Sequence, residues 1–208
     1  ASGHKARAEA EASTRRRALS AQYRVPALQG LPGWYAAEVS RLEERPVDAL
    51  GFRREGLRLG WQGQREPWSA SADLVLARET GRSQLRGGAF DGARQTLAYP
   101  ELSIGHRRID ERLVPEDGGQ WSARLRGGRI EARDTQRHFT QAELAAQWRT
   151  GSEARHAWIA RLALAGTRFD GDPASPEFPV SLRYFAGGDR SLRGYGYREV
   201  GPRFQGEV

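Results

Sequence analysis

The chain has 208 residues, with 33 lysines and arginines against 26 aspartates and glutamates, a formal net charge of +7 and a pI near 10.4. It has no cysteine, which excludes disulfides, thiolate metal sites and a cysteine nucleophile. The length suits one domain or a part of a larger one, and no apolar run approaches the roughly 20 residues that a membrane-spanning helix requires. This last test does not detect membrane barrels, because their outward and inward residues alternate and average out.

Hydrophobic residues alternate with polar ones along most of the chain. The first such stretch is 4–12, where alanines alternate with Lys5, Arg7, Glu9 and Glu11. Alanine is a poor strand former, so a helix remains an alternative there. The same period returns with better strand formers at 57–62, 68–76, 121–126, 141–149 and 158–164. Six tryptophans lie at or near the expected strand ends: Trp34, Trp61, Trp68, Trp121, Trp148 and Trp158.

Turn-forming or polar segments separate these stretches: LQGLPG, RPVD, GQREP, RGGAFDGA, VPEDGG, GSEARH and DGDPASP. The sequence therefore predicts an all-β chain, an antiparallel meander of about nine strands of roughly 10 residues each. No linker or low-complexity block interrupts the pattern, so we expect one structural unit.

Two all-β interpretations remain open on the pattern alone. A soluble sandwich or barrel would turn the apolar face of each strand to a core, whereas an outer-membrane barrel would turn it to lipid and its polar face to a wet lumen. In the membrane barrel, the residues expected to point outward are Leu57, Leu59, Leu74, Leu76, Leu125, Leu144, Leu162 and Leu164. Those expected on the concave, lumenal side are Arg58, Asp73, Arg124, Arg126, Glu143 and Arg161.

The residue patterns give little support to catalysis. The histidines His4, His106, His138 and His156 lack the spacing of a metal site. The DGD at 170–172 lacks the other ligands of a calcium loop, and the glycines of 194–201 have the wrong spacing for a dinucleotide fingerprint. We therefore expect no enzyme, no metal and no cofactor. The positive charge invites a soluble nucleic-acid-binding module as an alternative, although the arginines are spread along the chain and interleaved with acidic residues.

Residues 178–202 read FPVSLRYFAGGDRSLRGYGYREVGP. This stretch resembles the lumenal loop of the outer-membrane assembly-factor superfamily, which includes BamA, TamA and the two-partner secretion transporters. Its extended form, RYFAGGDRSLRGYGY followed by GP, is most similar to a TamA-like member. Two further segments resemble strand pairs of that barrel at lower specificity: GHKARAEAEASTRRRALSAQYRVP and QTLAYPELSIGHRRIDERLVPEDGGQWSARLRGG. The resemblance thus covers essentially residues 1–208.

The resemblance implies a partial transmembrane β-barrel. Residues 1–169 would supply roughly the third to the eleventh of about sixteen strands, and residues 170–208 the lumenal loop. The periplasmic POTRA domains, the seam strands and the C-terminal strand would lie outside this fragment. We expect such a piece to be an open, curved sheet with two unpaired edges.

The resemblance also implies which loop residues matter. In the family the loop folds back into the lumen, where its arginine meets a carboxylate on a later strand. A guanidinium suits this role because it forms bidentate, charge-assisted contacts. The implied partner lies beyond Val208. The implied motif comprises the anchor Arg193, its steric partners Gly194 and Tyr195, the internal ligand Asp189, and Gly187 and Gly188 at a tight turn.

By the same resemblance, the function is insertion of β-barrel proteins, especially autotransporters, into the bacterial outer membrane. The implied partners are outer-membrane lipid, the substrate polypeptides and the inner-membrane-anchored protein TamB, with no nucleic acid. A two-partner secretion transporter that exports a polypeptide is the alternative within the superfamily.

Overall fold

The computed structural model describes residues 3–28, 30–47, 50–83, 94–109, 117–132, 135–152, 156–171 and 178–185. Its elements are β1 (Lys5–Ala12), β2 (Arg16–Pro26), β3 (Trp34–Val47), β4 (Leu50–Arg65), β5 (Trp68–Ser83), β6 (Arg94–Ile109), β7 (Gly118–Ala132), β8 (Thr135–Ser152), β9 (His156–Phe169) and the short 3₁₀-helix η1 (Val180–Leu182). No described helix is long and apolar enough to cross a membrane.

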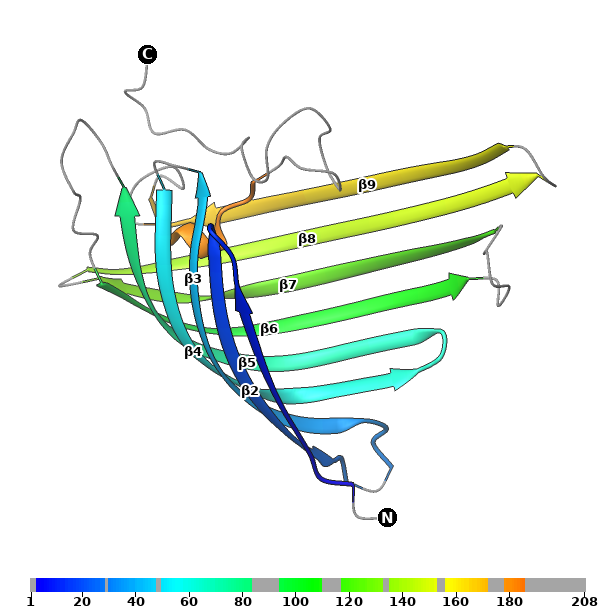
Figure 1. Cartoon of the computed structure of the whole chain (residues 1–208), viewed down its shortest axis with the longest axis horizontal. Helices are drawn as coiled ribbons and strands as arrows, with labels where there is room; N and C mark the ends of the chain where they lie inside the picture. Colours follow the sequence, from blue (N-terminus) through cyan, green and yellow to red (C-terminus); the bar gives the residue numbers. More distant parts are fainter. Residues whose placement is uncertain are drawn as a thin grey trace.

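The nine strands form one antiparallel sheet in which each strand pairs with its neighbours in the sequence, in the order β1 to β9. The sheet curves strongly, so that it has a convex and a concave face, and β1 and β9 form its two edges (Figure 1). The prediction of an all-β antiparallel meander that stays open is confirmed. Residues 5–12 form a strand and not a helix, because every one of them pairs with β2.

Strands β3 to β9 are longer than the sequence predicts, with 14 residues in β3 and β9 and up to 18 in β8. Several segments expected as turns continue a strand instead. The GQREP segment extends β4 to Arg65 and leaves only Glu66 and Pro67 as the turn before β5. Cross-strand pairing continues through these polar residues, as between Gln64 and Ser69, so polar strand ends do not mark turns.

Alternation places the two faces as predicted for a barrel. In β5, Asp73, Val75, Ala77 and Glu79 are buried, while Leu74 and Leu76 between them are exposed. Exposed leucines occur on the same convex face in the neighbouring strands, including Leu59, Leu125, Leu144, Leu162 and Leu164. Leu57 is partly exposed. No described strand forms a second sheet over this face.

The hydrophobic core lies on the concave face, between the sheet and the segment that contains η1 (Figure 1). It consists of Val75, Ala77, Leu97, Tyr99, Ile130, Phe139 and Phe169 from five strands, with Phe178 and Leu182 from the segment. Gly128 is required beside this core, because a Cβ there would meet the Ala98 carbonyl oxygen at 2.3 Å and the Tyr99 Cβ at 2.6 Å. The glycine lets β7 approach the Tyr99 Cα and Cβ closely.

Candidate functional site on the concave face

A short segment, residues 178–185, is docked on the concave face and is called the docked segment below. Its Phe178 ring packs edge-on against Phe169 at 5.0 Å and against Phe139 at 6.3 Å between ring centroids. Leu182 is completely buried. Aromatic packing of this kind adds to the burial of apolar area, so these two side chains fix the segment to the strand ends of β8 and β9.

A buried carboxylate holds the centre of the docked segment. Glu79 of β5 is 1% exposed. It accepts a 3.1 Å hydrogen bond from the Ser181 backbone N–H and a second from the Ser181 hydroxyl. Arg54 donates to the Ser181 hydroxyl oxygen at 2.8 Å and to the Tyr99 hydroxyl at 2.7 Å. Since a buried carboxylate is costly without such donors, Glu79 and Ser181 form a specific anchor.

A second anchor lies three strands away in the sheet, on β8. Gln141 of β8 donates to the Leu182 carbonyl oxygen and to the Thr167 hydroxyl, both at 2.8 Å. Within the segment, the Arg183 guanidinium donates to the Phe178 carbonyl oxygen at 2.9 Å and closes the turn. Strand side chains thereby pair with the Ser181 N–H and the Leu182 carbonyl oxygen, and Arg183 of the segment itself pairs with the Phe178 carbonyl oxygen, as buried backbone groups require.

Tyr184 connects the docked segment to the charged part of the concave face. Its hydroxyl donates to the Glu143 carboxylate at 3.2 Å. Burial raises the pKa of the Tyr184 hydroxyl, and the negative charge of Glu143 adds to this rise. The hydroxyl is therefore held in its neutral, donating form.

Three arginines and three carboxylates form an ion-pair network next to the docked segment. Glu101 lies 2.8 Å from Arg58 and 3.6 Å from Arg126. Arg58 also reaches Asp73 at 3.3 Å. Glu143 binds Arg124 and Arg126, each at 3.0 Å. The members lie on adjacent strands, and direct cross-strand pairs include Asp73 with Glu101, Glu101 with Arg126, and Arg124 with Glu143.

One glycine makes room for this network. A Cβ at Gly60 would lie 2.2 Å from an Asp73 carboxylate oxygen and 2.4 Å from the Ala72 carbonyl oxygen. Asp73 and Glu101 are 6% and 5% exposed. Breaking a buried pair leaves a charge without compensation, whereas the intact pair contributes little net stability. The network therefore fixes the side-chain arrangement of the wall more than it stabilises the sheet.

The network contains five of the six residues predicted for the concave side. The sixth, Arg161, donates to Gln147 on β8 at 3.3 Å.

The predicted loop motif lies outside the described residues; it comprises Arg193, Gly194, Tyr195, Asp189, Gly187 and Gly188. The docked segment leads directly into it. Sequence reasoning missed Glu79, Gln141 and Arg54 as anchors; the only available signal was their position on the polar side of strands.

Among the described residues, no three His, Asp or Glu side chains are grouped so that they could hold a metal ion. His106 is instead packed between two tryptophans on the convex face, 4.7 Å from Trp68 and 6.3 Å from Trp121 between ring centroids.

Comparison with known proteins agrees with this architecture. The family model of the Omp85 superfamily domain matches residues 2–207. A search among curated proteins finds no match to the chain. The chain therefore belongs to the Omp85 superfamily, whose β-barrel members are outer-membrane proteins that insert or secrete other proteins.

Proposed function

We propose that the protein assists the insertion of β-barrel polypeptides, in particular autotransporters, into the bacterial outer membrane as a TamA-like member of its superfamily. The observation that carries this proposal is the docked segment: the chain is anchored to the concave wall by Glu79 and Gln141 immediately before the stretch RYFAGGDRSLRGYGY. Membership of the Omp85 superfamily supports it.

In the proposed mechanism the two faces of the sheet have different tasks. The convex face, with its exposed leucines, contacts the lipid chains. The docked segment and the loop after it occupy the lumen and keep the wall in one arrangement. A substrate strand then adds to an open strand edge by backbone hydrogen bonding, at a seam where the membrane is locally thinned. This process needs no nucleotide and no covalent step.

Arg193 is the anchor of the loop in this mechanism. Its guanidinium pairs with a carboxylate on a wall strand beyond Val208, while Gly194 and Tyr195 allow the close approach and Asp189 orients the turn. By the same proposal, Gly187 and Gly188 allow a tight bend in the loop. TamB would be the partner in the periplasm, and the export of a polypeptide by a two-partner secretion mechanism remains the alternative within the superfamily.

The test uses the intact protein with Arg193→Ala and Arg193→Lys. Loss of a partly buried ion pair costs on the order of a few kcal/mol, enough to release the loop but not to unfold a closed barrel. We expect Arg193→Ala to keep heat-modifiable gel mobility and to lose substrate assembly, and Arg193→Lys to lose part of it because an ammonium does not form the bidentate contact. Normal assembly by Arg193→Ala would contradict the role of Arg193. Export of a soluble polypeptide without barrel insertion would favour the secretion alternative.

A further inference from the structure

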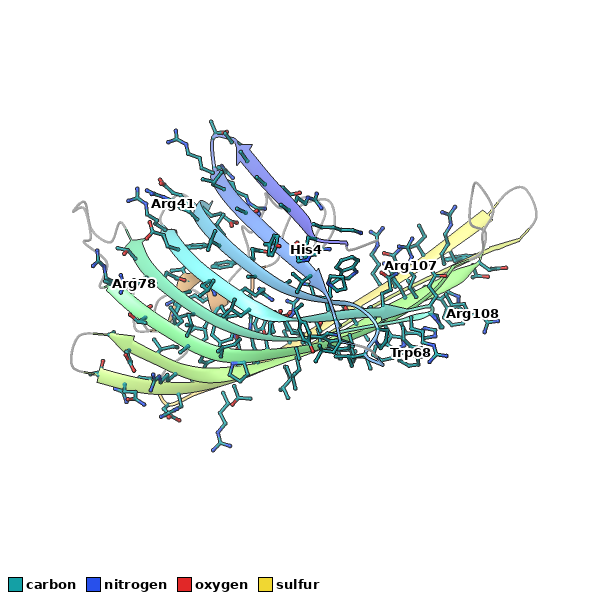
Figure 2. All side chains as sticks on the ribbon, turned by 90° about the horizontal axis from the view of Figure 1, so that it is seen from below. His4, Arg41, Trp68, Arg78, Arg107 and Arg108 are labelled. Carbon is teal, nitrogen blue, oxygen red and sulfur yellow. The ribbon has the colours of Figure 1, made fainter. Side chains whose placement is uncertain are left out.

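The convex face ends in two chemically different rims. At one end of the strands, the apolar band meets the outward tryptophans Trp61, Trp68, Trp121, Trp148 and Trp158. At the other end it meets arginines, one each from seven of the nine strands. This arginine rim consists of Arg17, Arg41, Arg53, Arg78, Arg94, Arg129 and Arg168. Figure 2 shows the separation, with Arg41 and Arg78 at one end and Trp68 at the other.

The register shows that these arginines point outward. Arg78 follows Leu74 and Leu76 at the same spacing of two, and Arg168 lies four residues after Leu164 and hence on the same face as Leu162 and Leu164. All seven side chains are exposed. They therefore continue the lipid-facing surface of the sheet and do not belong to the concave network.

Carboxylates neutralise only part of the rim. Arg53 pairs with Glu43 at 3.2 Å, Arg129 with Glu131 at 3.3 Å, and Arg41 with Glu55 at 3.6 Å. Arg78, Arg94 and Arg168 form no ion pair with any other described residue. On a solvated face with balanced charges, this excess of positive charge would not be concentrated at one end of an apolar band. The arginine rim can therefore bind anions.

The residue type points to phosphate. All seven rim cations are arginines, whose planar guanidinium groups bind phosphate oxygens in a bidentate way, and Lys5, the only lysine of the chain, lies elsewhere. The other rim, with tryptophans and the two outward arginines Arg65 and Arg108, suits an interface with fewer anions. The two ends of the band thus match two leaflets of different charge.

We propose that the arginine rim binds the phosphate groups of a multiply phosphorylated anionic lipid. This lipid lies in the leaflet at the end of the sheet where β9 ends and the chain continues toward the docked segment. The inference rests on the membrane-spanning interpretation of the proposed function but not on its substrates. Nucleic acid is a poorer fit, because the rim is a single curved row and the apolar band beside it would remain exposed to water.

The experiment measures lipid retention by the intact protein in neutral detergent. Micelles containing lipid A, which carries two phosphates, or phosphatidylcholine are added, and lipid phosphate that co-elutes with protein on gel filtration is quantified at low and high salt. The rim variant is R78Q/R94Q/R168Q. The matched control is R65Q/R107Q/R108Q, which removes the same charge at the tryptophan end. Heat-modifiable gel mobility checks that each variant is folded. If the triple rim variant does not fold, the single variants R78Q and R94Q are measured in its place.

Each arginine near an anionic membrane surface is worth a roughly fivefold change in affinity. We therefore expect the rim variant to bind lipid A at least tenfold more weakly, with a smaller salt effect, and the control to bind as the wild type does. Equal losses in both variants, an unchanged rim variant, equal retention of phosphatidylcholine, or preferential binding of an oligonucleotide would overturn the proposal. Substrate insertion measured in the same preparations is a separate readout, so its failure in the wild type would overturn the proposed function without changing the lipid result.

Discussion

The convex and concave faces of the sheet carry similar aliphatic side chains but differ in what covers them. On β5, Leu74 is 47% exposed, whereas its neighbour Val75 is 4% exposed. The chain itself covers Val75, through Phe178 and Leu182 of the docked segment. No described residue covers Leu74 to the same extent, and the proposed function assigns its cover to lipid. Under that proposal the same sheet has two apolar surfaces, one completed by protein and one by the membrane.

The largest expected effect concerns the surface that the protein completes. Phe178→Ala removes a ring that is 1% exposed and contacts Phe139 and Phe169, and such a truncation costs about 3–5 kcal/mol. We expect the docked segment to lose protection in hydrogen exchange followed by mass spectrometry of the intact protein. Trp158→Ala is the control, since Trp158 is 75% exposed on the convex face and far less packing is lost. Unchanged exchange in residues 178–185 of Phe178→Ala would refute the packing role.

The surface that the membrane completes can be tested along a single strand. Leu74→Arg places a charge in the apolar band, which costs about 2–4 kcal/mol in a bilayer, whereas Thr80→Arg on the same face of β5 lies at the arginine rim, where the cost is about 0–1 kcal/mol. Reversible urea unfolding from lipid vesicles measures both variants. Equal costs at the two positions would show that the convex face does not lie in lipid as inferred.

The alternation of residues was enough to predict which side chains share a face, because side-chain direction in a strand depends only on local sequence. The meander order was predicted from the turn-forming segments between the strands. Alternation could not predict the concave core. Val75 and Ala77 alternate with Leu74 and Leu76, so residues 74–77 form a continuous apolar run, and the concave members Val75 and Ala77 do not fit a pattern that expects polar residues on that face. Their burial depends on Phe178, which is about a hundred residues away in the chain, and such long-range contacts leave no periodic signal.

For the candidate site too, the sequence predicted which side chains share a face but not which of them are in contact. The charges of Arg58, Asp73 and Arg126 were expected on the concave side from alternation, but not their pairing, which depends on strand register and on the space left by Gly60. Glu79 was missed because the alternating pattern ends at Leu76. Its partner Ser181 lies in a segment with no strand or helix pattern of its own, so only the fold brings the two together.

The smallest expected effect is a pH dependence of the contact between Tyr184 and Glu143, which connects the two halves of the concave face. Burial, and then the charge of Glu143, raise the pKa of the Tyr184 hydroxyl above its usual value of about 10. A group whose pKa is raised on folding contributes stability that is fully present below the unfolded pKa and is lost as the pH rises through the folded pKa. The contribution of Tyr184 to docking is therefore constant up to about pH 10 and falls above it. Titration of tyrosinate absorbance at 295 nm, taken as the difference between the wild type and Tyr184→Phe, isolates the signal of this hydroxyl.

We expect the titration midpoint of Tyr184 to lie above that of a free tyrosine. Glu143→Gln, which removes the repelling charge, should shift this midpoint downward. A midpoint at the ordinary value, or no response to Glu143→Gln, would mean that Tyr184 is solvated and does not connect the docked segment to the charged network.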